Sequence, residues 1–133
     1  AASGATALGV GLRRCEKLRE LGVARNPLGA GFMKLLAGLG ASIVVLDATD
    51  CGLDDRAAIS AATNLPRWPQ LRSLRLGSNN DIGPVGVESI IRGLLGSPSL
   101  KLADLKGASV KNELTRFQKL LLDGGAELSR VRL

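Results

Sequence analysis

Two pairs of aspartates, Asp47 with Asp50 and Asp54 with Asp55, have the type and spacing that acid–base chemistry could use. General acid–base catalysis near neutral pH most often employs histidine, and the 133-residue chain contains none. Aspartates also accept hydrogen bonds from backbone N–H groups in turns and at helix N-termini. We interpret both pairs as loop and helix-cap residues and expect that the chain is not an enzyme.

The sequence offers few ligands for a metal or a cofactor. Its two cysteines, Cys15 and Cys51, lie 36 positions apart without a CxxC motif or a histidine. The stretch "GASIVVLDA" is similar to the acidic end of a dinucleotide-binding strand, but no GxGxxG motif stands upstream at the required distance. We therefore expect no metal, no cofactor, no disulfide framework and no small-molecule substrate, and an intracellular, reducing compartment, either the cytoplasm or an organelle interior.

Composition indicates one folded domain with an aliphatic core. Apolar residues make up 45% of the chain and aromatic residues only 2%. The apolar stretch from Leu35 to Leu46 is about half of the roughly 20 residues that a membrane-spanning helix needs, so we expect no membrane span.

A repeat with a period near 28 residues organises the whole sequence. Its most specific copy is "LRSLRLGSNNDIGPVGVESIIRGLLGSPSL", from Leu71 to Leu100. Copies start near 18, 43, 71, 100 and 128, so the periods are 25, 28, 29 and 28 residues. Between the starts, apolar or small residues recur every four positions, as at Gly86, Ile90 and Leu94, which predicts a helix in each copy.

The pattern LxxLxLxxN/CxL followed by a helix resembles a leucine-rich repeat of the ribonuclease-inhibitor type. This resemblance implies an α/β solenoid of about four to five repeats, a horseshoe segment with a parallel β-sheet on its concave face and helices on its convex face. Residues 1–133 then form a single domain, with 1–17 as the helix of a preceding repeat. Because neither end has a unit that covers the apolar edge, we expect a fragment or subunit of a larger assembly.

The turns after the strands should be closed by inward polar residues. Asn79 can satisfy backbone donors and acceptors with its amide, Asn26 should do the same in the first turn, and Cys51 is a smaller, weakly polar substitute. Trp68 lies in a loop that returns to a strand. It either covers the edge of the core or forms an exposed anchor for a partner.

Side chains that point outward from the strands form the candidate binding surface. Gly22, Asp47, Arg75, Asp104 and Arg132 form a central column of alternating charge, which is either a self-satisfied ladder or a stripe that binds a partner. The predicted partner-binding residues are Arg19, Arg25, Asp47, Arg72, Arg75, Lys101, Asp104, Lys106, Arg130 and Arg132.

This surface is basic, with eight basic and four acidic side chains when Glu20 and Asp50 are included. Such a surface favours an acidic protein or nucleic-acid phosphates. No outward aromatic residue is available to stack on bases. We expect a non-enzymatic scaffold that binds other proteins, most simply other subunits of a complex, and the alternative is a ribonucleoprotein subunit that contacts RNA phosphates.

Overall fold

Five short parallel strands and five α-helices make up the α/β fold in residues 2–133, which the computed structural model describes. The sheet has the strand order β1-β2-β3-β4-β5, formed by Glu20–Gly22 (β1), Val45–Asp47 (β2), Ser73–Arg75 (β3), Leu102–Asp104 (β4) and Val131–Arg132 (β5). The helices are Ala2–Leu12 (α1), Gly31–Gly38 (α2), Asp55–Asn64 (α3), Pro84–Leu95 (α4) and Leu114–Asp123 (α5). Three short 3-10 helices, Leu65–Arg67 (η1), Lys111–Glu113 (η2) and Leu128–Arg130 (η3), lie in the connections. The predicted parallel α/β arrangement is confirmed.

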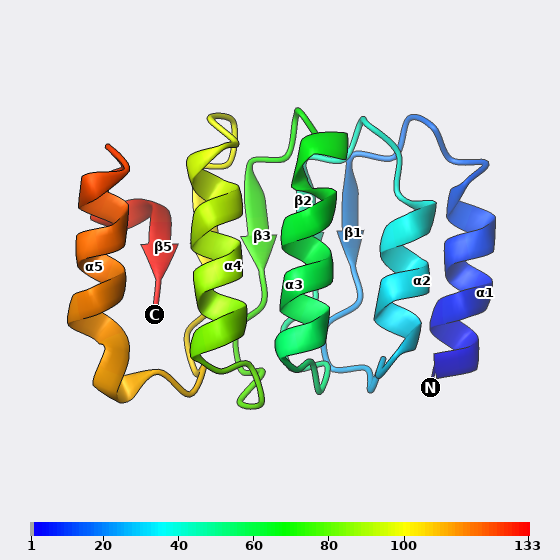
Figure 1. Ribbon diagram of the computed structural model, residues 1–133. Helices are drawn as coiled ribbons and strands as arrows, with labels where there is room; N and C mark the ends of the chain where they lie inside the picture. Colours follow the sequence, from blue (N-terminus) through cyan, green and yellow to red (C-terminus); the bar gives the residue numbers. More distant parts are fainter. Residues whose placement is uncertain (1) are drawn as a thin grey trace.

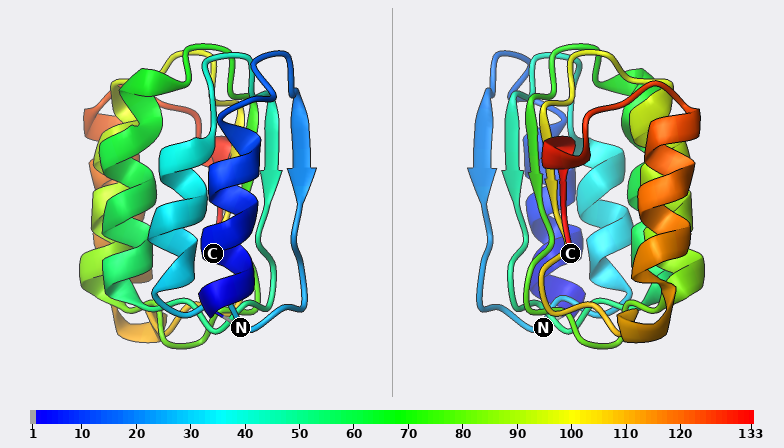
Figure 2. Two further views of the ribbon diagram at one scale, coloured as in Figure 1. Left: turned by 90° about the vertical axis from the view of Figure 1, so that its right-hand side faces the viewer. Right: turned by 90° about the vertical axis from the view of Figure 1, so that its left-hand side faces the viewer.

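The molecule has two layers, one of helices and one of strands. Figure 1 shows the helices side by side in chain order in front of the sheet. Figure 2 shows that all the helices lie on one side of the sheet, so the other side is uncovered. A parallel sheet is usually covered on both faces, and an open face is therefore a surface that needs a functional explanation.

The core lies between the layers and is built from one inward residue per strand. Leu46 pairs with Leu74 and Leu74 with Ala103, and all three are buried. Leu71 and Leu76, two leucines of the repeat motif, are also buried. Together with the helix residues that face the sheet, they form one continuous aliphatic cluster.

Helix starts follow the expected signals, with one difference. Asp54 caps α3 by accepting a hydrogen bond from the Ala57 N–H at 3.1 Å, and Pro84 occupies the first turn of α4. Asp55, however, reaches the next helix: its Oδ1 accepts hydrogen bonds from the N–H groups of Gly83 (2.7 Å) and Gly86 (2.9 Å) at the start of α4. A carboxylate is favourable there because the helix N-terminus carries partial positive charge.

Helices α1 and α2 approach each other closely through glycines. A methyl group placed on Gly38 would lie 2.0 Å from the carbonyl oxygen of Gly9, and one on Gly9 would lie 2.4 Å from the carbonyl oxygen of Lys34. Any larger side chain at either glycine therefore requires the two helices to separate. Among the described helices, none combines the length and the apolar composition that a membrane crossing requires.

Candidate functional site

The uncovered side of the sheet, which we call the sheet face, presents outward side chains from all five strands. Strict alternation along a strand would make every second residue face outward. In β3 and the residue before it the pattern differs: Leu71 and Leu74 are buried, whereas Arg72 is exposed and Ser73 is half-buried. Two consecutive residues therefore lie outside the core at the start of each strand.

A shared hydrogen-bond acceptor accompanies this departure at the strand starts. The N–H groups of Arg72 and Ser73 both donate to the carbonyl oxygen of Val44, at 2.8 and 3.2 Å. The N–H groups of Lys101 and Leu102 share the carbonyl oxygen of Arg72 in the same way. The strands nevertheless keep a one-to-one parallel register, with Val45 opposite Ser73 and Ser73 opposite Leu102, so no residue is inserted.

In this register the sheet face has three rows that run across the strands. The leading row, at the strand starts, is formed by Arg19, Val44, Arg72 and Lys101. The central row is formed by Glu20, Val45, Ser73 and Leu102. The charged row is formed by Gly22, Asp47, Arg75, Asp104 and Arg132. Sequence reasoning found the basic residues of the leading row and all of the charged row, but missed the uncharged Val45, Ser73 and Leu102 between them.

The charged row is only partly a self-satisfied ladder. Arg132 lies 3.7 Å from the Asp104 carboxylate, measured from Nη1 to Oδ2. Asp47 instead accepts hydrogen bonds from the backbone N–H and the hydroxyl of Thr49, at 3.0 and 2.6 Å. Within residues 2–133, Arg75 has no carboxylate within 4.0 Å. The guanidinium of Arg75 is therefore available to a partner.

The basic side chains of the leading row are also unpaired. Arg19, Arg72 and Lys101 are exposed, and no ion pair within 4.0 Å involves them in the described chain. Lys101 makes only a local bond, from Nζ to the Pro98 carbonyl oxygen at 3.1 Å. Solvent-exposed cations without a structural partner can bind an external anion or carboxylate at little cost to the fold.

Arg130 does not belong to this surface, so its assignment as a partner-binding residue is wrong. Its guanidinium donates to the carbonyl oxygens of Leu94, Ser97 and Leu100, at 3.2, 3.1 and 2.7 Å from Nη2. Carbonyl groups at a helix C-terminus lack partners within the helix, and a cation satisfies them. Arg130 therefore fixes the end of α4 to the following loop.

Arg67 has a similar structural role, which sequence reasoning missed. Its Nη2 donates to the carbonyl oxygens of Ala37 and Leu39, at 3.5 and 3.2 Å, at the end of α2. No local pattern marks this residue, because its acceptors lie about one repeat earlier in the chain.

Arg25 and Lys106 are exposed on the turns that leave the sheet. Arg25 has a left-handed backbone conformation, with φ 64°, and Asp50 and Ser78 repeat this conformation in the next two turns. Without Arg130, the predicted surface retains seven basic and four acidic side chains, a formal charge of +3.

Asn79 closes its turn with both ends of its amide. Its Oδ1 accepts hydrogen bonds from the N–H groups of Cys51 (2.9 Å) and Leu53 (3.1 Å), which belong to the preceding turn. Its Nδ2 donates to the carbonyl oxygens of Ala48, Leu76 and Gly77 at 2.9–3.2 Å. Asn79 is 1% exposed, so none of these groups can exchange the bond for water.

Asn26 and Cys51 make fewer bonds at the equivalent places. Asn26 is exposed, and its Nδ2 donates to the carbonyl oxygens of Val23 (2.9 Å) and Ala24 (3.2 Å). The buried Cys51 thiol donates to the carbonyl oxygen of Val23 at 3.2 Å. Burial raises the pKa of the Cys51 thiol above its ordinary value, which keeps it protonated.

Trp68 lies inside the molecule, so the interpretation of Trp68 as an exposed anchor is wrong. Its side chain is 1% exposed and packs in the aliphatic cluster. The backbone of the loop turns it inward, because the N–H of Trp68 donates to the Leu65 carbonyl oxygen and its own carbonyl oxygen accepts from Leu71. The indole Nε1 is buried without a hydrogen-bond partner in the described chain.

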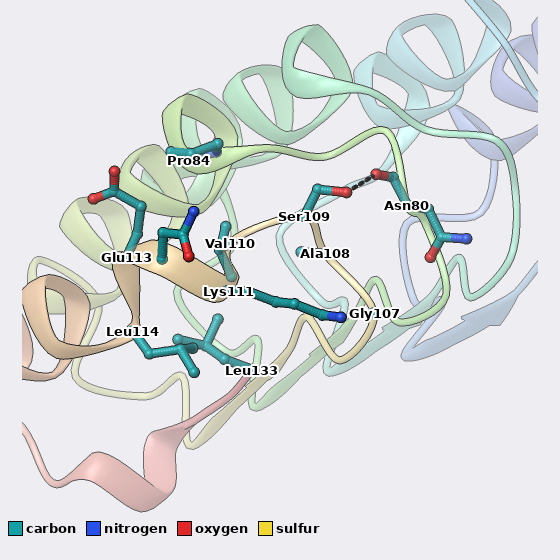
Figure 3. A pocket seen from close by; sticks show the side chains of 11 residues that line it. Asn80, Pro84, Gly107, Ala108, Ser109, Val110, Lys111, Glu113, Leu114 and Leu133 are labelled. Carbon is teal, nitrogen blue, oxygen red and sulfur yellow. Dashed lines mark hydrogen bonds between the residues drawn. The ribbon is translucent and has the colours of Figure 1, made fainter.

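A hollow beside Leu133 has few charged side chains in its lining. Figure 3 shows that it lies between the turn at residues 107–113, Leu114 and Leu133. Its charged side chains are Lys111 and Glu113, and the Glu113 carboxylate is 2.6 Å from Nε of Arg116. Within residues 2–133, no cluster of three or more histidine, cysteine or acidic side chains could hold a metal ion.

On the helix layer, the principal charge cluster joins α4 to α5. The Glu88 carboxylate accepts hydrogen bonds from Arg116 and Arg92, and Arg116 also pairs with Glu113. The hydrogen bond from Arg116, with a second from Arg92, lowers the pKa of Glu88. This cluster links two neighbouring helices and does not form part of the sheet face.

Comparisons with known proteins place the fold. No protein-family model matches the chain, and no curated protein matches its sequence. The tropomodulin C-terminal domain of Caenorhabditis elegans matches the structure with a TM-score of 0.79, covering 97% of this chain and 81% of that domain at 16% identity. A structure described as leiomodin-1 actin-binding site 2 matches with a TM-score of 0.75, covering 95% of this chain and 76% of that one at 18% identity.

These matches correct one expectation. The resemblance to ribonuclease-inhibitor-type repeats is wrong, because solved structures of a tropomodulin domain and a leiomodin-1 site match the chain instead. The quoted motif covers the inward strand residues and the turn, which carry too little information to identify the subtype of a repeat. At 16% and 18% identity, the chain shares the fold of the tropomodulin and leiomodin C-terminal domains.

Proposed function

We propose that this chain is a non-enzymatic protein-binding module that acts through its sheet face, with actin as the partner to test first. The observation that carries the proposal is the match over 95% of the chain to a structure described as an actin-binding site. The open sheet face supports it, because Arg72, Arg75 and Lys101 are exposed there without ion-pair partners in the described residues.

Two further assignments accompany this function. We propose that the strand–turn–helix units form a leucine-rich-repeat solenoid of about four to five repeats in a single domain, with the sheet face on its concave side. The shared register of β1 to β5 and the Asn79 bonds between successive turns support it. We also propose an intracellular, reducing location, which the two free cysteines support.

A binding assay with purified actin tests the function. Cosedimentation with filaments and fluorescence anisotropy with labelled monomers measure the two forms of actin separately. Charge reversal of Arg75 to Glu should weaken binding about tenfold, because it replaces an available cation by a repelling anion. Lys119→Glu, on the outer side of α5, is the matched control and should leave the affinity unchanged.

Two outcomes would contradict the proposal. The first is the absence of detectable binding to either form of actin at a protein concentration of about 100 μM, which would mean a Kd well above that concentration. The second is an equal effect of Arg75→Glu and Lys119→Glu, which would exclude the sheet face. RNA that binds with a steep salt dependence while actin does not would favour the ribonucleoprotein alternative.

A further inference from the structure

The sheet face combines the central row, in which three of four residues are uncharged, with the leading row, in which three of four are basic, at a spacing that fits an α-helix. Neighbouring strands in a sheet lie about 4.8 Å apart, so the five strands span about 19 Å across the rows. An α-helix rises 1.5 Å per residue, and its i+3 and i+4 side chains advance about 4.5 and 6.0 Å along its axis. A helix of about 13 residues would therefore span the sheet, and its side chains at i, i+3 or i+4, and i+7 would lie over the uncharged residues of β2, β3 and β4.

The central row supplies the apolar contact. Val45 and Leu102 are apolar residues that remain partly exposed on the sheet face. The Ser73 hydroxyl between them is buried and has no hydrogen-bond partner in the described chain. Val44, beside Val45, widens this uncharged area. A partner that covers it gains about 25 cal/mol for each square ångström of apolar surface removed from water.

The flanking rows determine the charges that the partner needs. Toward the strand starts, Arg19, Arg72 and Lys101 have no carboxylate within 4.0 Å in the described chain. Toward the strand ends, the charged row alternates in sign, from Asp47 to Arg132. The two flanks therefore differ, and only the leading row calls for a uniformly acidic partner surface.

Other ligands fit this arrangement less well. The backbone N–H and C=O groups of the inner strands are already paired within the sheet, so an added strand has no free groups on the face itself. A nucleic acid would contact the basic residues but would leave Val45 and Leu102 without an apolar neighbour, and no aromatic residue stands in the three rows to stack on its bases.

We propose that the sheet face binds an amphipathic helix of the partner protein, laid across the strands, with its apolar stripe on the central row and acidic side chains along the flank that meets the leading row. This inference rests on the proposed function, because it specifies the partner chemistry for the same face. It requires no particular partner, and a synthetic helix should suffice.

The probe is a fluorescein-labelled peptide of about 14 residues, the length of helix that spans the sheet. It carries leucines at i, i+3 or i+4, and i+7 and glutamates along one flank. One matched peptide has the same composition with the glutamates moved opposite the leucines, and another has lysines on the flank. Anisotropy should give the acidic-flank peptide an affinity at least about tenfold higher than either matched peptide.

Protein variants locate the site. The double charge reversal Arg72→Glu and Lys101→Glu should lower the affinity for the acidic-flank peptide at least about tenfold and should raise the affinity for the lysine-flank peptide. Leu102→Ser should lower the affinity for both the acidic-flank and the lysine-flank peptide, because it removes apolar contact rather than charge. Lys119→Glu should change neither, and circular dichroism checks that each variant keeps its helix content.

Several results would overturn the inference. Equal affinity for all three peptides, or a double reversal that acts no more strongly than Lys119→Glu, would exclude the proposed orientation. If actin binds through Arg75 while no peptide binds, the helix inference fails and the proposed function stands. If the acidic-flank peptide binds as described and actin does not, the actin assignment fails and the helix-binding face stands.

Discussion

Replacing Asn79 by alanine should be among the most destabilising single substitutions in the chain. The change removes the acceptor of two buried N–H groups, those of Cys51 and Leu53. It also removes a donor from three carbonyl oxygens, of which that of Gly77 keeps the Asp50 N–H. An unpaired buried donor costs about 1–3 kcal/mol, so the two N–H groups alone predict a loss of about 2–6 kcal/mol. A domain of this kind has a total free energy of unfolding of about 5–15 kcal/mol.

The matched control is Asn26→Ala, the same change at the equivalent place of the first turn. Asn26 is exposed and only donates hydrogen bonds, so its removal leaves no backbone N–H without an acceptor. The Val23 carbonyl oxygen keeps the Cys51 thiol as a donor. The expected loss is below about 1 kcal/mol. Urea unfolding followed by circular dichroism measures both variants, with the slope against urea checked for a constant value.

Asn79→Asp tests the donor half of the amide separately. The aspartate keeps an acceptor for the two N–H groups but turns an oxygen toward three carbonyl oxygens. Burial should raise its pKa in the folded state above that in the unfolded state. The folded state then binds the proton more tightly, so the free energy of unfolding should increase as the pH falls toward the unfolded-state pKa. Equal losses for Asn79→Ala and Asn26→Ala, or no pH dependence for Asn79→Asp, would refute the reasoning.

Three further predictions concern the helix layer and the thiols. Gly38→Ala should destabilise the packing of α1 on α2 by about 1–3 kcal/mol, because the added methyl group would lie 2.0 Å from the Gly9 carbonyl oxygen of α1. Hydrogen exchange of the α1 amides measures this loss, and unchanged protection would contradict the prediction. Arg116→Ala should raise the pKa of Glu88 toward its ordinary value in an NMR titration; the wild-type contribution to stability is present above the unfolded-state pKa and is lost as the pH falls through the lowered folded-state pKa. A thiol reagent should modify the exposed Cys15 quickly and the buried Cys51 only after unfolding, and equal rates in the folded protein would show that Cys51 is accessible.

Local patterns predicted the strands, the turns and most helix starts. Leu71, Leu74 and Leu76 are buried where the periodicity placed them, and Asp54 caps the helix that follows it. These features depend on a residue and its near neighbours in the chain. Alternation along a strand and capping at a helix start are therefore legible from the sequence.

The rest of the surface depends on contacts between units. Strict alternation does not predict that Arg72 and Ser73 both lie outside the core. At this place their N–H groups share the Val44 carbonyl oxygen of the neighbouring strand, a contact that the local sequence does not specify. Arg130 was assigned to the surface because its position in the repeat is outward, but its acceptors lie 30 to 36 residues earlier. Trp68 is likewise turned inward by the local loop geometry, which no repeat pattern specifies.

The polar bonds that cross between units have a consequence for how the protein comes apart. Asp55 caps the next helix, Arg67 and Arg130 bind the ends of earlier helices, and Asn79 holds the turn before its own. Because each unit completes its neighbour, an inner unit cannot open alone without leaving buried groups unpaired on both sides. Unfolding should therefore be cooperative across the inner units and should begin by fraying at the two ends, where each unit has a single neighbour.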